Sequence, residues 1–225
     1  MKKNMLTVAL VFCAMVMFTG CPEPANVPSE TNEQTVTTPD GITVAVPIVT
    51  LPNLPASVGE DPFAGKTFRH ETEYVDGSIS HDDFIFASDG TVNETVDDSI
   101  YEYSYDATKL YMRYKYLDRV DPYTDEVIKE QATPQEYINL YSAYMAEHYY
   151  EMYGGKEEMQ KAYNDNKSGF DEKSGGSTFE DYVEFDLQWH IKALAGMVGR
   201  LYEYTYTENY FTRSGNGYIY TLVEN

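Results

Sequence analysis

Cysteine is scarce in this chain, which has only Cys13 and Cys21 among its 225 residues. Tryptophan occurs once, as Trp189, and 16 basic side chains stand against 37 acidic ones. The scarcity of cysteine excludes a disulfide-stapled scaffold, because Cys13 lies in an apolar leader that we expect to be removed. The formal charge of −21 argues against nucleic acid as a partner, since its phosphates would be repelled.

Long apolar runs and common catalytic motifs are also missing. After Phe18, no stretch approaches the roughly 20 apolar residues of a transmembrane helix. The patterns H-E-x-x-H, G-x-S-x-G and the P-loop do not occur. The sequence therefore predicts a protein that is not an enzyme, with no catalytic residue, no cofactor and no metal. An exported hydrolase whose acids are hidden among the many carboxylates is the less favoured alternative.

The first twenty residues have the layout of a signal peptide. Two lysines precede an apolar stretch at 5–18, and small residues follow before Cys21. The residues Phe18-Thr19-Gly20-Cys21 resemble the lipobox of bacterial lipoproteins. The resemblance implies cleavage before Cys21 and acylation of that cysteine by chains such as palmitate, which would anchor the protein to a membrane. An ordinary secretory signal with a chance cysteine is the alternative.

Residues 21–62 have the composition of a linker. They are rich in Pro, Thr, Asn, Val and acidic residues and contain no aromatic residue. We interpret them as a lipidated cysteine followed by a flexible tether, although Ile42 to Val46 alternate well enough to be an edge strand. With the lipobox, this tether predicts a bacterial cell-envelope protein, at the outer membrane or the cell surface.

Residues 63–225 predict one globular domain that is rich in β-structure. Tyrosines recur at spacing two, which places them on one face of a strand. Turn signals such as Asp76-Gly77 and Asp89-Gly90 cut the sequence into segments of strand length. The predicted strands are 66–75, 82–87, 91–96, 99–106, 109–117, 201–208, 209–213 and 217–223.

A helical insertion at about 133–199 interrupts these strands. Thr133-Pro134-Gln135-Glu136 reads as a capping box, and the helix that it opens would end at Gly154-Gly155. A short helix is predicted at 155–165, then a loop at 164–177. Ser177-Thr178-Phe179-Glu180 would cap a last helix that reaches about Val198.

The order of elements resembles that of lipocalin-like, calycin-type bacterial lipoproteins. The similar motifs are Gly65-Lys66-Thr67-Phe68, Phe84 to Val92, Tyr101 to Asp106 and Lys109 to Met112. The resemblance implies a small barrel that the C-terminal strands close. The predicted fold class is α+β, mainly β: an antiparallel meander or a small barrel of about eight strands, with two or three helices packed on it.

One aromatic face of this sheet is the candidate binding site. Aromatic rings there could stack on sugars or on apolar ligands, although tyrosine is also simply a good strand former. The helix around the single tryptophan would cover the opening. The candidate ligand-binding residues are Phe84, Phe86, Tyr101, Tyr103, Tyr105, Tyr114, Tyr116 and Trp189.

Three further features of the sequence are candidates for metal binding or catalysis. His190 with Asp186 and His148 with Glu151 could face each other across two helices, but buried neutral histidines are commoner. The loop from Asn164 resembles an EF-hand but has Gly175 where the bidentate glutamate should be. The residues His81-Asp82-Asp83 read as a surface turn.

Three classes of function remain open from the sequence. The favoured one is a non-catalytic binding module for an apolar or sugar-like small ligand or for a surface protein. The second is a structural or envelope-interaction lipoprotein with no small ligand. The third is the exported hydrolase.

Overall fold

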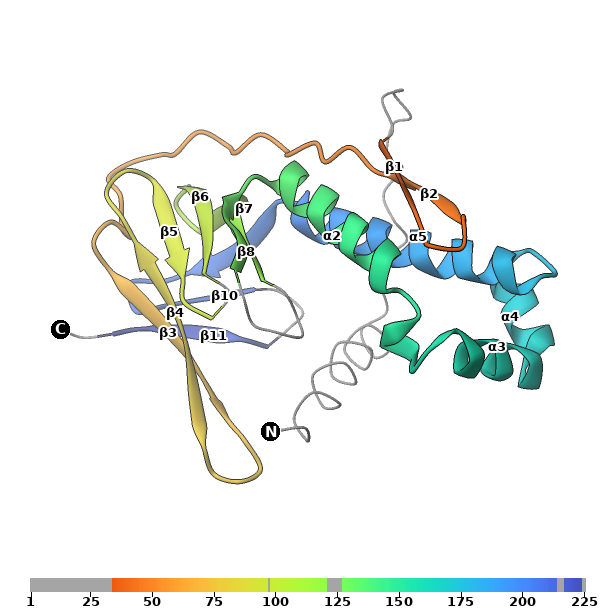
Figure 1. Ribbon diagram of the computed structural model, residues 1–225. Coiled ribbons are helices and arrows are strands. Elements are labelled where there is room, and N and C mark those ends of the chain that lie inside the picture. The colour runs from red at the N-terminus through yellow and green to blue at the C-terminus, as the bar shows by residue number, and fades with distance from the viewer. Residues whose placement is uncertain (1–33, 97, 121–126, 214–216, 224–225) are drawn as a thin grey trace. The chain divides into compact units, whose positions relative to one another are not determined.

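The computed structural model describes residues 34–96, 98–120, 127–213 and 217–223 (Figure 1). Their contacts divide them into two compact units. The barrel unit consists of 49–120, 127–137 and 198–223, and the helical unit consists of 34–48 and 138–197. The sequence predicts one domain over 63–225, and both units have residues in that range. The predicted helical insertion makes up most of the helical unit.

The barrel unit is a closed barrel of eight antiparallel strands. The order around the barrel is β6-β5-β4-β3-β11-β10-β9-β7, and β7 pairs with β6 to close the ring. A ninth strand, β8, extends the sheet by pairing with the end of β7. The strands are β3 (Thr67–Glu73), β4 (Ile79–Phe86), β5 (Thr91–Glu94), β6 (Ser99–Tyr105), β7 (Lys109–Val120), β8 (Val127–Ala132), β9 (Tyr202–Tyr206), β10 (Tyr210–Arg213) and β11 (Ile219–Leu222).

Aspartates in Asx turns form the tight hairpins between these strands. Asp76 Oδ1 accepts the backbone N–H of Ser78, Asp89 Oδ1 accepts that of Thr91, and Asp106 Oδ1 accepts that of Thr108. These side-chain bonds add to the backbone hydrogen bonds of the same turns, and together they fix the loop length, which sets the strand register. The predicted strands at these turns and the expected mainly-β fold class are confirmed.

The helical unit contains four α-helices and one short 3-10 helix among its described residues. They are α2 (Pro134–His148), which lies in this unit from Ile138 onward, η1 (Glu151–Tyr153), α3 (Lys156–Asp165), α4 (Lys167–Ser174) and α5 (Phe179–Val198). The capping box of α2 is confirmed, since Thr133 and Glu136 exchange hydrogen bonds. At α5, the reciprocal pair is instead Thr178 and Asp181.

A two-stranded hairpin belongs to the helical unit. It consists of β1 (Gln34–Thr37) and β2 (Thr43–Val46). Val44 packs into the helical core, and the Gln188 amide bonds both backbone groups of Ala45. Residues 34–46 therefore form this hairpin, and β2 matches the edge strand that the sequence allowed at Ile42 to Val46. Residues 47–62 form neither helix nor strand.

Helix α4 corrects the loop predicted at 164–177. It begins after Asn166 and ends at Gly175, whose φ of 69° is the left-handed conformation of a helix C-cap. Lys167 pairs with Asp171 one turn later, which stabilises so short a helix. None of the helices in the described residues is long and apolar enough to cross a membrane.

Candidate functional site

Eight inward-facing side chains with polar groups gather toward one end of the barrel. Inward residues alternate along each strand, and the strands are antiparallel. On the inner face, His70 follows Phe68 along β3 and Asp82 precedes Phe84 along β4. His70 and Asp82 are register partners and therefore lie toward the same end of the barrel. Applied to all eight strands, this defines the polar cluster: His70, Asp82, Glu94, Tyr101, Tyr114, Tyr202, Arg213 and Tyr220.

Phe63 closes the opposite end of the barrel. Its side chain is 1% exposed, and its ring centroid lies 4.7 Å from that of Tyr206 and 5.0 Å from that of Phe86. Asp61 holds this segment in place by accepting the backbone N–H of Phe63 and the hydroxyl of Tyr103. Phe63 therefore blocks access to the interior from its own end.

Aromatic rings fill the middle of the barrel, between Phe63 and the polar cluster. Phe84 contacts the rings of Tyr101, Phe211 and Tyr220, with centroids 4.8 to 5.9 Å apart. Phe84 and Phe211 are both buried. The polar cluster thus rests on a packed aromatic floor.

Two carboxyl groups lie together in the polar cluster. Asp82 is within hydrogen-bonding reach of Glu94 and of the Tyr220 phenol. Burial raises the pKa of the Asp82 carboxyl, and Glu94 is only 6% exposed. Two carboxyl groups this close disfavour the doubly ionised state, because two negative charges in a buried place repel each other. Asp82 Oδ1 is buried and has no hydrogen-bond partner among the described residues.

Three tyrosine rings make up another side of the cluster. Tyr101 stacks on Tyr114 with centroids 4.5 Å apart, and Tyr202 meets both rings edge-on. Burial raises the pKa of Tyr101 and, at the floor, that of Tyr204. Both phenols are therefore neutral at ordinary pH and keep a proton to donate.

Two guanidinium groups lie over the ring of Tyr202. The Cζ of Arg213 is 4.9 Å from the ring centroid, and that of Arg200 is 4.7 Å from it. Arg213 is the register partner of Tyr204, so it points inward. Neither arginine has an ion pair with a carboxylate in the described part of the chain.

Solvent reaches the polar cluster on one side. The four tyrosines of the cluster and Glu94 are buried. His70, Asp82 and Arg213 are half-buried, and they lie on β3, β4 and β10. A ligand would therefore meet an imidazole, a carboxyl group and a guanidinium group first.

The structure brings together most of the residues predicted from the sequence. Six of them point into the barrel: Phe84, Phe86, Tyr101, Tyr103, Tyr105 and Tyr114. Tyr116 is half-buried, beside the irregular register of β6 and β7. Trp189 lies on α5 in the helical unit and is 37% exposed.

The charged members of the cluster are not among the residues predicted from the sequence. The same period-two alternation that marks the tyrosines also applies to His70, Glu94 and Arg213. Together with the strand register, it places these three residues on the inner face. The surface turn predicted at His81-Asp82-Asp83 is wrong, because these residues lie inside β4. Asp82 faces inward, whereas Asp83 pairs with Arg69 on the outer face.

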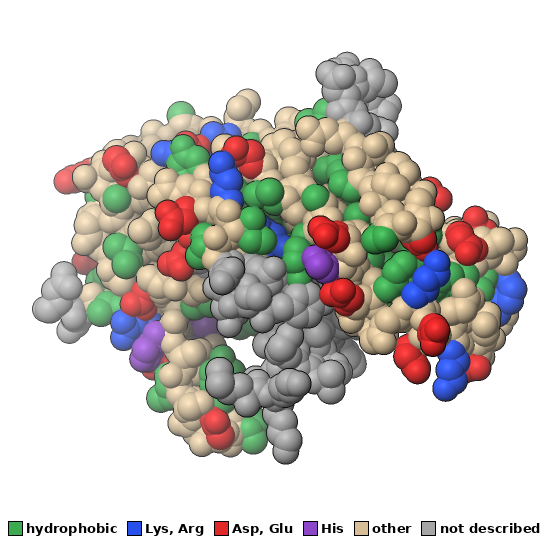
Figure 2. All heavy atoms as spheres, in the orientation of Figure 1, with side chains coloured by type: hydrophobic (Ala, Val, Ile, Leu, Met, Phe, Trp, Pro, Cys, Tyr) green, Lys and Arg blue, Asp and Glu red, His purple; other side chains and the backbone are tan. Residues whose placement is uncertain are grey.

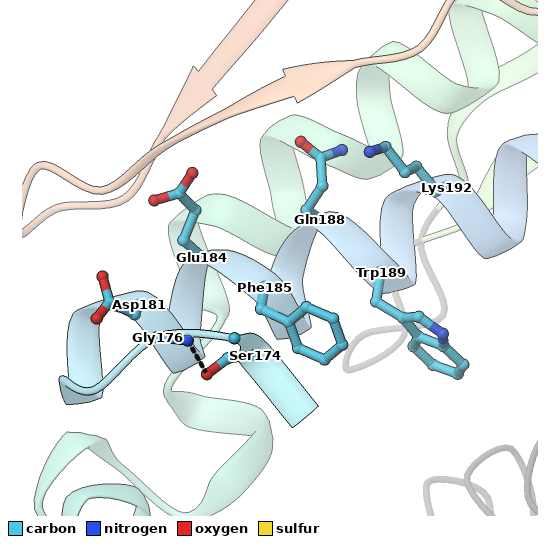
Figure 3. A pocket seen from close by; sticks show the side chains of 9 residues that line it. Ser174, Gly176, Asp181, Glu184, Phe185, Gln188, Trp189 and Lys192 are labelled. Atoms are coloured by element: carbon cyan, nitrogen blue, oxygen red, sulfur yellow. Dashed lines mark hydrogen bonds between the residues drawn. The ribbon is translucent and has the colours of Figure 1, made fainter. Parts of the chain in front are cut away.

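The helical unit has an open pocket of about 410 Å³ along α5 (Figure 3). Phe185 and Trp189 stand side by side in it, each 37% exposed, and Glu184 and Lys192 project from another face of the helix. The pocket wall needs a glycine at position 176, because a Cβ there would lie 2.3 Å from the Cβ of Asp181.

The histidines predicted as metal candidates have local partners. His148 contacts Glu151 at 3.1 Å, and Asp186 accepts the phenols of Tyr149 and Tyr153. Burial lowers the pKa of His190, so this imidazole is neutral at pH 7. Within the described residues, no group of three or more His, Cys, Asp or Glu side chains could hold a metal ion. The EF-hand-like residues lie on α3 and α4, so they form no calcium-binding loop.

The fold defines the class of protein as a closed eight-stranded antiparallel barrel joined to a helical unit, consistent with a lipocalin-like fold. Comparison with protein-family models, with curated proteins and with solved structures gives no match.

Proposed function

We propose that this protein is a lipid-anchored envelope lipoprotein whose barrel binds a small, sugar-like ligand without turnover. The observation that carries the proposal is the polar cluster, to which all eight strands of the ring contribute one side chain. Exported binding modules of this architecture take ligands at the barrel mouth. The lipid anchor at Cys21 belongs to the proposal as well, and this residue lies outside the described residues.

The chemistry of the cluster favours a hydroxylated ligand over an apolar one. Carboxyl, imidazole, guanidinium and phenol groups can satisfy several hydroxyl groups at once, and aromatic rings can stack on a sugar face. A long apolar ligand would need an empty interior, whereas Phe63, Phe84 and Phe211 pack within this one. A compact polar ligand at the mouth needs no such space.

The carboxyl pair supports binding rather than glycoside hydrolysis. The two carboxyl groups of a glycosidase stand about 5 to 9.5 Å apart, so that the sugar fits between them. Asp82 and Glu94 are within hydrogen-bonding reach of each other, which leaves no room for an anomeric carbon. They are better placed to accept hydrogen bonds from the hydroxyl groups of a ligand.

Calorimetry with the full-length protein in detergent tests the proposal. Glucose, galactose and maltose are titrated beside laurate, and we expect a saturable signal from at least one sugar. The variant Tyr220→Phe removes a cluster hydroxyl and should weaken binding about three- to tenfold. The control Tyr111→Phe removes a hydroxyl that bonds Asp106 on the outer face, so affinity should not change.

Three results would overturn the proposal. The first is the absence of binding at millimolar concentration by every sugar, neutral or anionic, and the second is equal weakening by the two tyrosine variants. The third is release of product from nitrophenyl glycosides that disappears in Asp82→Asn, which would make the protein a hydrolase.

The exposed aromatic pair on α5 favours a surface protein as the second candidate partner. Phe185 and Trp189 are large apolar side chains that reach solvent together. Trp189→Phe should leave sugar affinity unchanged if the barrel holds the ligand. A loss of sugar binding in this variant would move the site to the helical unit.

A further inference from the structure

We infer that the ligand of the polar cluster carries an oxyanion, which Arg213 and Arg200 bind. This inference rests on the proposed binding function and narrows its ligand class to a hydroxylated anion, such as a sugar acid or a sugar phosphate.

Among the described residues, some arginines form an ion pair with a carboxylate and others do not. The chain has 37 acidic side chains, so an arginine readily finds a carboxylate. Arg69 pairs with Asp83 and Arg113 pairs with Glu102, at 2.6 and 2.7 Å. Arg200 and Arg213 have no such pair in the part of the chain that the structure describes, although both lie at the barrel mouth.

Arg200 and Arg213 both lie over the same aromatic ring. Both guanidinium groups lie over the ring of Tyr202, which is 7% exposed. A guanidinium that lies over an aromatic ring keeps N–H donors for other partners, and its planar fork matches the two oxygens of a carboxylate or phosphate. Nε of Arg200 is buried and has no hydrogen-bond partner among the described residues.

The opposite side of the cluster would hold the hydroxyl groups of the same ligand. Burial raises the pKa of the Tyr204 phenol; the charges of Arg213 and Arg200 lower that pKa and the charge of Asp82 raises it, so all three groups lie within electrostatic reach of this phenol. Asp82 Oδ1 is a buried acceptor there with no hydrogen-bond partner among the described residues. A ligand with an oxyanion at one end and hydroxyl groups at the other satisfies both sides.

Long-range electrostatic attraction cannot produce a preference for an anionic ligand over a neutral one. A protein with a formal charge of −21 repels small anions at long range. An anion bound more tightly than its neutral analogue must therefore gain short-range bonds. Arg213 of the cluster and Arg200, which lies over the same ring of Tyr202, can supply them.

Four sugars of similar size and different charge test the inference by calorimetry on the full-length protein in detergent: glucuronate, glucose 6-phosphate, glucose and glucosamine. We expect at least one of the two anions to bind about tenfold or more tightly than glucose, because charge-assisted hydrogen bonds are the stronger kind. A preference for glucuronate identifies a carboxylate ligand, and a preference for glucose 6-phosphate identifies a phosphate ligand.

Variants show which residues cause the tighter binding of an anion. In Arg213→Gln and in Arg200→Gln, the ratio of anion affinity to glucose affinity should fall toward one. Arg213→Lys should recover only part of the ratio, since lysine keeps the charge but not the planar fork. Arg69→Gln, on the outer face, is the control and should keep the full ratio.

The outcomes separate the inference from the proposed function. Equal affinity for glucuronate, glucose 6-phosphate and glucose overturns the inference and leaves the sugar-binding module intact. A preference for glucosamine, or an anion preference that survives in both glutamine variants, also overturns it. Failure of all four sugars to bind overturns the proposed function itself. Thermal unfolding of each variant shows whether it is folded, and Arg200→Gln and Arg213→Lys give independent readings if Arg213→Gln unfolds.

Discussion

Neighbouring aspartates on β4 have opposite environments. Asp82 faces into the barrel, where burial raises the pKa of its carboxyl group. Asp83 faces outward, where the hydrogen bond from Arg69 lowers the pKa of its carboxyl group. The two-residue period of a strand is enough to give adjacent residues opposite electrostatic roles.

This difference predicts opposite effects of Asp82→Asn and Asp83→Asn on stability. An acid whose pKa is raised by folding contributes stability only below its unfolded pKa, and loses that contribution as the pH rises through the folded pKa. Ionised Asp82 therefore costs stability at pH 7, and Asp82→Asn should raise Tm there. Its advantage should vanish near pH 3.5, below the unfolded pKa of about 3.9.

Asp83→Asn should behave in the reverse way. An acid whose pKa is lowered by folding contributes stability above its unfolded pKa and loses it as the pH falls through the folded pKa. The variant should thus have a lower Tm at pH 7, and the deficit should shrink in acid. Thermal unfolding from pH 3.5 to 7 measures both variants, and the same sign for both at pH 7 would contradict the assignment of Asp82 to the interior.

Single elements show what the sequence could and could not predict. Strands with clear alternation and an Asx turn, such as β6, were predicted nearly to the residue. Strand β8 was missed because its residues are exposed from Val127 to Gln131, so no apolar alternation marks it. Helix α4 was missed because its serines and Gly169 have loop composition, while its stability comes from Phe170 packing against Tyr182.

The candidate site was predictable only in part, for a related reason. Tyrosines at spacing two are visible in sequence, and six predicted site residues do point into the barrel. Which charged residues join them depends on the register of strands far apart in the chain. His70 and Arg213, for example, enter one cluster only after β3, β11 and β10 have paired.

Phe63 is predicted to stabilise the barrel by closing one end. Phe63→Ala would leave a cavity among five aromatic neighbours and should lower the free energy of unfolding by about 3 to 5 kcal/mol. Phe185→Ala, at an exposed position, should cost less than about 1 kcal/mol. Hydrogen exchange of the β7 and β9 amides reports on the barrel itself. Equal protection in the two variants would show that Phe63 does not close the barrel.

The whole molecule combines a strong negative charge with small, local basic sites. Figure 2 shows acidic side chains scattered over the visible face, with lysine and arginine side chains among them. An anionic lipid surface repels such a protein, so electrostatic attraction would not hold it at a membrane. A membrane-bound protein of this charge needs an anchor that does not depend on charge.

Cys21 is predicted to be that anchor, with its acyl chains in the bilayer. A single myristoyl chain binds a membrane only marginally, at about 10⁴ M⁻¹, whereas the several chains of a lipoprotein hold almost irreversibly. Cys21→Ala should therefore remove lipid labelling and move the protein from the detergent phase to the aqueous phase in phase separation. Cys13→Ala is the matched control, because Cys13 lies in the apolar leader, and this variant should still partition into detergent. Complete retention of Cys21→Ala in the detergent phase would refute acylation as the means of attachment and favour an ordinary secretory signal.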